Sequence, residues 1–290
     1  MPFVHAISPV IVSLGPFAIR WYSLVYVLGF LLAYWLLVRA ARKGALKNVT
    51  VEDAEEYLIW LIVGSVAVAR LLYVLVYNPA FYFVQPWKVL FLWEGGLSFH
   101  GGLLGAVLAT LWFTKRRKIS FYALADLLVT PFALVLVFGR IANFVNGELV
   151  GRVTDVAWCV TYPDVPGVDG CRHPSQFYEA GKNLAIFAVL LGLTLNKKLK
   201  AWLREGTLFW LFVLLYGVGR FLTNFFRAPD LGDPVFLGLI LGQWLSLLMV
   251  AVALPATIFF LNTSGKKDGT NTGKGGTRTT RKKSGKEKNQ

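Results

Sequence analysis

About seven long apolar runs, separated by polar or basic connections, form the main pattern along the chain. Each run approaches the roughly 20 residues that a helix needs to cross a lipid bilayer. The pattern predicts an all-α polytopic integral membrane protein with about seven transmembrane helices. The expected helices cover about 21–38, 57–77, 98–113, 122–143, 176–195, 207–226 and 236–261, and Pro131 is expected to interrupt the fourth.

The connections between these helices predict the remaining organisation of the chain. Residues 78–97 are rich in proline and tryptophan, which suits a short helix lying in the headgroup layer. The polar stretch at about 146–174, between helices four and five, predicts a small head outside the membrane. Residues 1–262 thus form one transmembrane domain, and the basic tail over 263–290 is too polar to fold by burial.

Capping signals mark the start of two of the helices. Thr50 precedes an acidic run and predicts the N-cap of the second helix. Ser175, after Pro174, predicts the N-cap of the fifth.

The placement of charge sets the expected orientation. A composition of 56% hydrophobic and 16% charged residues excludes an ordinary soluble domain. The net charge of +14 could suit nucleic acid, but 21 of the 30 basic residues lie after helices one, three and five and in the tail. By the positive-inside rule, the C-terminus is cytoplasmic, and the N-terminus and head are periplasmic. Membrane lipids, rather than nucleic acid, are the expected partners.

The cysteines and histidines predict neither a metal site nor a resident cofactor. Cys159 and Cys171 both lie in the head, where they could pair in an oxidising periplasm or remain ordinary thiols, and the sequence leaves both outcomes open. His5, His100 and His173 lie far apart without the spacing of metal ligands.

Ionisable side chains within the apolar runs are the first candidate functional residues, because such groups are costly in hydrocarbon and usually mark a site. Arg140 ends the fourth helix, and Asn143 shares its helical face. A guanidinium beside an amide suits a phosphate ester. The alternative is a snorkelling arginine followed by an Asn-Gly turn.

Three further intramembrane cations, Arg70, Lys182 and Arg220, occur in the second, fifth and sixth helices. On the sixth helix, Tyr216, Arg220 and Asn224 recur every four residues and form one polar stripe. For Arg70, we favour a second lipid-phosphate contact over a buried structural ion pair.

The run from Gly139 to Arg152, GRIANFVNGELVGR, resembles the signature of bacterial prolipoprotein diacylglyceryl transferases. Ala142 replaces the usual Gly, and Val150 stands where Trp is frequent. The resemblance extends over most of residues 21–246. Its other elements are Trp21-Tyr22 with Tyr26, His100-Gly101-Gly102, the run 172–179 and the run 216–230.

One departure from the family concerns the partner of Arg220. The family usually carries Glu where Asn224 stands, so Arg220 loses its expected carboxylate. Glu148 is the substitute candidate. The run 172–179, which ends in Glu179, is expected to serve mainly as scaffolding.

The resemblance implies a catalytic membrane domain in a bacterial inner membrane. It would transfer the diacylglyceryl group of phosphatidylglycerol to the lipobox cysteine of a preprolipoprotein, forming a thioether and releasing glycerol phosphate. Arg140 and Arg220 would hold the phosphate, and His100 would take the thiol proton. Tyr26, Asn143, Asn146 and Glu148 would orient the headgroup, and Gly151, Tyr216 and Arg70 complete the expected substrate-binding set.

Two other classes of function are compatible with intramembrane arginines. A lipid flippase would bind headgroups in passage, but it usually has an internal repeat, which we do not find in this sequence. A membrane adaptor would pair its arginines internally. Four intramembrane cations argue against a passive anchor.

Overall fold

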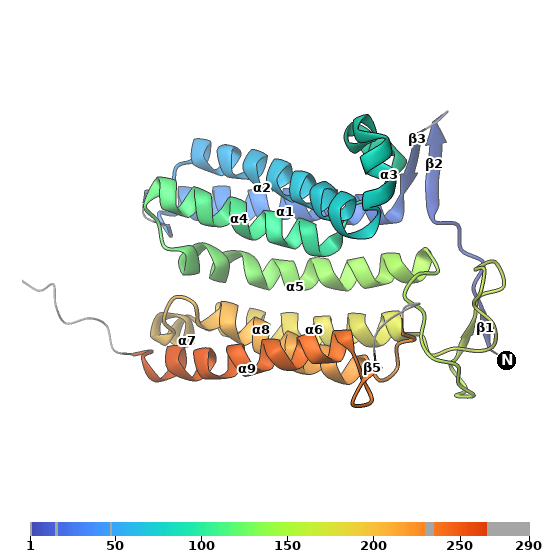
Figure 1. Cartoon of the computed structure of the whole chain (residues 1–290). Coiled ribbons are helices and arrows are strands. Elements are labelled where there is room, and N and C mark those ends of the chain that lie inside the picture. Colours follow the sequence, from blue (N-terminus) through green and yellow to red (C-terminus); the bar gives the residue numbers. More distant parts are fainter. Residues whose placement is uncertain (1, 15–16, 47, 230–234, 266–290) are drawn as a thin grey trace, which may run out of the picture.

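The computed structural model describes residues 2–14, 17–46, 48–229 and 235–265. It consists mainly of long helices that run side by side, with a small head at one end (Figure 1). The predicted tail lies outside the described residues from 266 onward.

Each of the seven predicted helices is present in the described part of the chain. The long helices are α1 (Trp21–Arg42), α2 (Val51–Leu72), α4 (Phe99–Arg117), α5 (Phe121–Val145), α6 (Ser175–Leu195), α8 (Thr207–Thr223) and α9 (Leu241–Asn262). Among the described residues, five helices are long and apolar enough to cross a membrane: α1, α2 with its extension to Tyr77, α5, α6 and α9. The fold class is therefore that of a helical membrane protein.

The predicted break in α5 is wrong, because the helix continues through Pro131 to Val145. Proline removes one backbone donor, and a packed membrane helix tolerates that loss. The seventh helix starts later than predicted, at Leu241, because a hairpin precedes it. Its strands β5 (Val235–Phe236) and β6 (Leu239–Ile240) are joined by a tight turn.

The capping predictions had different outcomes. Thr50 caps α2 as predicted: its hydroxyl accepts from the Asp53 N–H at 3.2 Å, and the Asp53 carboxylate accepts from the Thr50 N–H at 2.9 Å. The prediction for Ser175 is wrong. Its hydroxyl donates to the Leu149 carbonyl oxygen at 2.8 Å and so ties α6 to the loop after α5.

Helix α5 lies between two groups of helices and shares a hydrophobic core with each. One core joins it to α1, α2 and α4, and a second joins it to α6 and α8 (Figure 1). At one end of the bundle, the Asp126 carboxylate of α5 accepts from the backbone N–H groups of Gly206 and Phe209, both at 2.8 Å, at the start of α8. This contact fixes α8 against α5.

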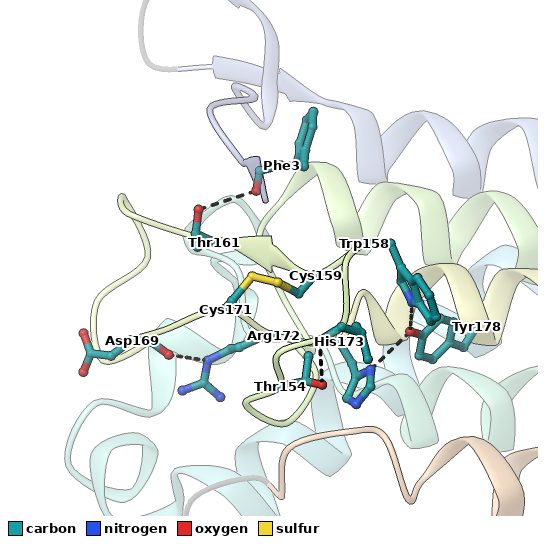
Figure 2. The surroundings of a disulfide bond; sticks show 11 residues. Phe3, Thr154, Trp158, Cys159, Thr161, Asp169, Cys171, Arg172, His173 and Tyr178 are labelled. Atoms are coloured by element: carbon teal, nitrogen blue, oxygen red, sulfur yellow. Dashed lines mark hydrogen bonds between the residues drawn. A yellow bond between two sulfur atoms is a disulfide. The ribbon is translucent and has the colours of Figure 1, made fainter. Parts of the chain in front are cut away.

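The head is closed by a disulfide between Cys159 and Cys171, which resolves the alternative left open by the sequence (Figure 2). Strand β1 (Phe3–Val4) pairs in parallel with β4 (Val160–Thr161), so the N-terminal segment belongs to the head. A third short pair, β2 (Val10–Leu14) with β3 (Phe17–Arg20), leads into α1. The sequence analysis predicted none of these strands.

Aromatic packing joins the head to the end of α5. His5 Nε2 donates to the Phe144 carbonyl oxygen at 2.8 Å, and its ring packs against Phe144 and Tyr162. Burial raises the pKa of Tyr162 above its ordinary range, so this phenol stays protonated.

The segment between α2 and α4 is organised by Arg70. A π-helical turn (Tyr73–Tyr77), α3 (Pro79–Val84) and two 3-10 turns (Pro86–Leu90, Leu92–Glu94) build this segment. The Arg70 side chain is buried, and its guanidinium donates to the carbonyl oxygens of Lys88, Val89, Phe91, Gly95 and Gly96.

The hydrogen bonds of Arg70 indicate a structural role, whereas the sequence predicted a contact with a lipid phosphate. A guanidinium has five N–H groups, and the five carbonyls occupy them all. The alternative from the sequence was a buried structural ion pair. The structure differs from that alternative because backbone carbonyls, rather than a carboxylate, accept from Arg70.

We predict that Arg70→Met destabilises the protein by about 3 kcal/mol, because five carbonyls lose a charged donor. The unfolding temperature in detergent should fall, and proteases should cut within residues 78–97. Arg116→Met is the control, because that side chain is 54% exposed. Equal stability of the two variants would contradict the role of Arg70.

Candidate functional site

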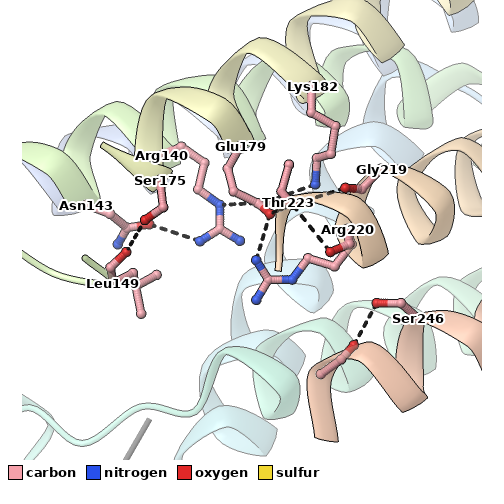
Figure 3. A network of polar contacts seen from close by, with 11 residues as sticks. Arg140, Asn143, Leu149, Ser175, Glu179, Lys182, Gly219, Arg220, Thr223 and Ser246 are labelled. Atoms are coloured by element: carbon pink, nitrogen blue, oxygen red, sulfur yellow. Dashed lines mark hydrogen bonds and ion pairs between the residues drawn. The ribbon is translucent and has the colours of Figure 1, made fainter. Parts of the chain in front are cut away.

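Three helices bring three cations to one carboxylate, that of Glu179 on α6 (Figure 3). Arg220 of α8 approaches Glu179 Oε1 at 2.8 Å through Nη1. Lys182 of α6 approaches Oε2 at 2.9 Å through Nζ, and Arg140 of α5 approaches the same oxygen at 3.5 Å through Nε. The Thr223 hydroxyl also donates to Oε1.

The cluster is buried and carries an excess of positive charge. The Glu179 side chain is 4% exposed, and those of Arg140 and Arg220 are each 16% exposed. Counter-charges matter more here than in water, because low-dielectric surroundings strengthen electrostatic interactions. Among the described residues, three cations share this one carboxylate, and such a group of cations suits an anion with several oxygen acceptors.

The run 139–152 folds back on itself after α5. Arg140 Nη1 donates to Asn143 Oδ1 at 3.5 Å, as their shared helical face predicts. Asn143 and Asn146 then each donate to one oxygen of Glu148 at 3.1 Å. Gly147 permits this turn, because its φ of +68° is a left-handed conformation and an added Cβ would lie 2.7 Å from Val165.

Backbone hydrogen bonds hold the ends of the three helices together. The Gly151 N–H donates to the His173 carbonyl oxygen, the Arg152 N–H to that of Phe226, and the Ala228 N–H to that of Val150. The loop after α5 is thereby tied both to the entry into α6 and to the exit from α8. This local network explains why Arg140, Glu179 and Arg220 meet.

The predicted partner of Arg220 is wrong: its carboxylate is Glu179, not Glu148. Glu148 is already engaged by two amides of its own loop. Glu179 was missed because its run was interpreted as scaffolding. The signal was available, since a carboxylate in an apolar helix is as costly as a cation.

The three residues of the polar stripe on α8 differ in their contacts with the cluster around Glu179. Tyr216 lies beneath Lys182, with Nζ 4.0 Å from the ring centroid. Arg220 reaches Glu179. Asn224 is fully buried, and within the described part of the chain neither its amide oxygen nor its amide nitrogen has a hydrogen-bond partner.

Four predicted site residues lie outside this cluster. Tyr26 of α1 is exposed, hydrogen-bonds to Tyr22 at 3.2 Å and lies within electrostatic range of Glu148. His100 is exposed in the first turn of α4, at the same end of the bundle as Arg140, because residues 118–120 join α4 to α5 by a short turn.

The other two predicted site residues, Arg70 and Gly151, contact backbone groups. Arg70 binds the segment between α2 and α4, as described above. Gly151 packs against the backbone of His173, whose carbonyl oxygen would lie 2.2 Å from an added Cβ. The described residues contain no group of three or more His, Cys, Asp and Glu side chains placed to bind a metal ion.

Comparisons with known proteins give a consistent result. The model of the prolipoprotein diacylglyceryl transferase family matches residues 9–259. A phosphatidylglycerol–prolipoprotein diacylglyceryl transferase of Rhodospirillum centenum is 45% identical over 258 residues, covering 88% of this chain and 91% of that protein. Proteins of the same name from Geobacter sulfurreducens and Bordetella parapertussis are each 40% identical over 260 residues, covering 89% and 87% of this chain and 96% and 95% of their own lengths.

We predict that Glu179→Gln costs about 3–5 kcal/mol, because it leaves three buried cations without their carboxylate. Inorganic phosphate should then raise the unfolding temperature of the variant more than that of the parent protein, because the anion replaces the lost charge. Glu55→Gln, at an exposed position, is the control. A stable Glu179→Gln protein that does not respond to phosphate would refute the central role of this carboxylate.

Proposed function

The chain belongs to the prolipoprotein diacylglyceryl transferase family, and on that premise we propose that the cluster around Glu179 holds the phosphate of its lipid donor. The enzyme transfers the diacylglyceryl group of phosphatidylglycerol to a prolipoprotein, the first step of lipoprotein maturation. The single observation that carries the site is the meeting of Arg140, Lys182 and Arg220 on one buried carboxylate.

The chemistry explains why such a site needs cations. The cysteine sulfur attacks the glyceryl carbon, a C–S bond forms, and the C–O bond to phosphate breaks. The phosphodiester carries one negative charge, and the glycerol phosphate that leaves carries two once the thiol proton has gone to a base. Cations placed at the leaving oxygen stabilise this developing charge.

We assign the phosphate to Arg140 and Arg220. Both guanidinium groups pair with Glu179, and each side chain is 16% exposed, so both lie where the planar, bidentate geometry of a guanidinium suits a phosphate. Asn143, Asn146 and Glu148 adjoin Arg140 and would bind the hydroxyls of the headgroup. Tyr26, near Glu148, and Tyr216, beneath Lys182, would bound the site on α1 and α8.

The thiol proton is assigned to His100. Its imidazole is exposed at the end of the bundle where α5 delivers Arg140, and a ring nitrogen of a neutral imidazole can accept a thiol proton. The acceptor cysteine would come from the lipobox segment of the client protein. Arg70 and Gly151 are left out of this site, because Arg70 donates to backbone carbonyl oxygens and Gly151 packs against the backbone of His173.

The arrangement supports seven spans, with the head and N-terminus outside. Helices α4 and α8 are shorter or more polar than the five spanning candidates, but they run alongside them in the bundle (Figure 1). The basic ends of α1 and α4 lie opposite the head. A disulfide in the head favours an oxidising compartment.

We predict that Arg140→Ala and Arg220→Ala each lower transfer by about 10²–10³-fold or more, with normal membrane insertion. Purified protein would be incubated with phosphatidylglycerol and a lipobox peptide, and the peptide mass measured. Arg140→Lys should not restore activity, because an ammonium lacks the bidentate geometry. Arg39→Ala, at the far end of α1, is the control, and full activity of Arg140→Ala would refute the assignment.

The orientation predicts the accessibility of two thiols. In intact cells without their outer membrane, a membrane-impermeant maleimide should label Cys171 in the Cys159→Ser variant, and the parent protein only after reduction. A cysteine introduced at exposed Lys198, beyond α6, should stay unlabelled until the membrane is opened. The reverse pattern would overturn the proposed orientation.

A further inference from the structure

Lys182 occupies a slot formed by two helices. Its side chain is 8% exposed, its ammonium lies 2.9 Å from Glu179 Oε2, and it also lies over the Tyr216 ring at 4.0 Å. Across the interface, an added Cβ on Gly219 would lie 2.5 Å from Lys182 Cδ. The missing side chain of Gly219 therefore makes the room in which the lysine stem lies.

The two oxygens of Glu179 have different partners. Oε1 accepts from Arg220 and Thr223, whereas Oε2 is held mainly by Lys182 at 2.9 Å, with Arg140 more distant at 3.5 Å. Lys182 thus occupies the position close to Glu179 Oε2 that the Arg140 guanidinium could otherwise take. The Arg140 guanidinium remains beside Asn143 at the more exposed side of the cluster.

We propose that Lys182 is a positioning residue of the transfer reaction, which holds Glu179 so that Arg140 is available for phosphate and places a positive charge near the leaving group. This inference rests on the proposed function. Loss of the Lys182 charge would weaken the attraction of the doubly charged glycerol phosphate more than that of the singly charged phosphodiester. An interaction that strengthens as the bond breaks affects kcat more than KM.

Lys182→Met keeps the length of the side chain and removes its charge. We expect kcat to fall about 10- to 100-fold, with the KM for phosphatidylglycerol changed by less than about threefold. Lys182→Arg should recover part of the loss. Purified glycerol phosphate should bind the methionine variant about tenfold more weakly at pH 8, and nearly as well as the parent at pH 5, because a phosphate monoester loses its second charge near pH 6.

Gly219→Ala provides a second test, in which Lys182 and its charge are retained. Its new Cβ should displace Lys182 and lower kcat in the same way. In a Lys182→Ala background, the added methyl group meets no lysine stem, so Gly219→Ala should cause little further loss. Additive losses would indicate that Gly219 acts independently of the lysine.

The outcomes separate this inference from the proposed function. An inactive parent protein would overturn both. An active parent with unchanged kcat in Lys182→Met, or with a raised KM at constant kcat, would overturn the role of Lys182 alone. Thermal unfolding of each variant distinguishes a loss of activity from a loss of fold.

Discussion

One buried carboxylate holding three cations is the constraint on which the rest of this structure depends. Buried charged groups are tolerated only when they are paired, and Glu179 pairs with side chains from α5, α6 and α8. In the function proposed above, the same cluster also binds the phosphate of the lipid. On that proposal, stability and substrate binding use the same side chains.

The surrounding structure positions the helices that carry this cluster. Helix α5 contributes to both hydrophobic cores. It is linked to α8 at one end directly, through Asp126, and at the other end through Glu179 of α6, which pairs with both Arg140 and Arg220. The disulfide-closed head ties the loop after α5 to α6 and α8. On the other flank, Arg70 uses all its donors to shape the segment between α2 and α4. Two buried arginines thus have opposite roles, and their acceptors make the difference: backbone carbonyls saturate Arg70, whereas a shared carboxylate leaves Arg140 with donors to spare.

This chain also differs from the pattern expected of its family in the distribution of charge. A neutral, fully buried Asn224 stands where a carboxylate was expected, and its amide has no hydrogen-bond partner among the described residues. Within the described cluster, Glu179 is the carboxylate, and Lys182 is a third cation in a slot left open by Gly219.

The sequence by itself determined the helices, the head and the family, because hydrophobic runs, turn residues and a fourteen-residue motif are local properties of the chain. It also indicated that Arg140 and Asn143 share a face, since helical spacing fixes that relation. Only the tertiary structure decided that Arg220 meets Glu179 rather than Glu148, that Arg70 is saturated by carbonyls, and that β1 joins the head. These outcomes depend on which helices pack together and how far apart their polar atoms come to lie, and residues separated by 41 positions, such as Glu179 and Arg220, carry no local signal of that distance.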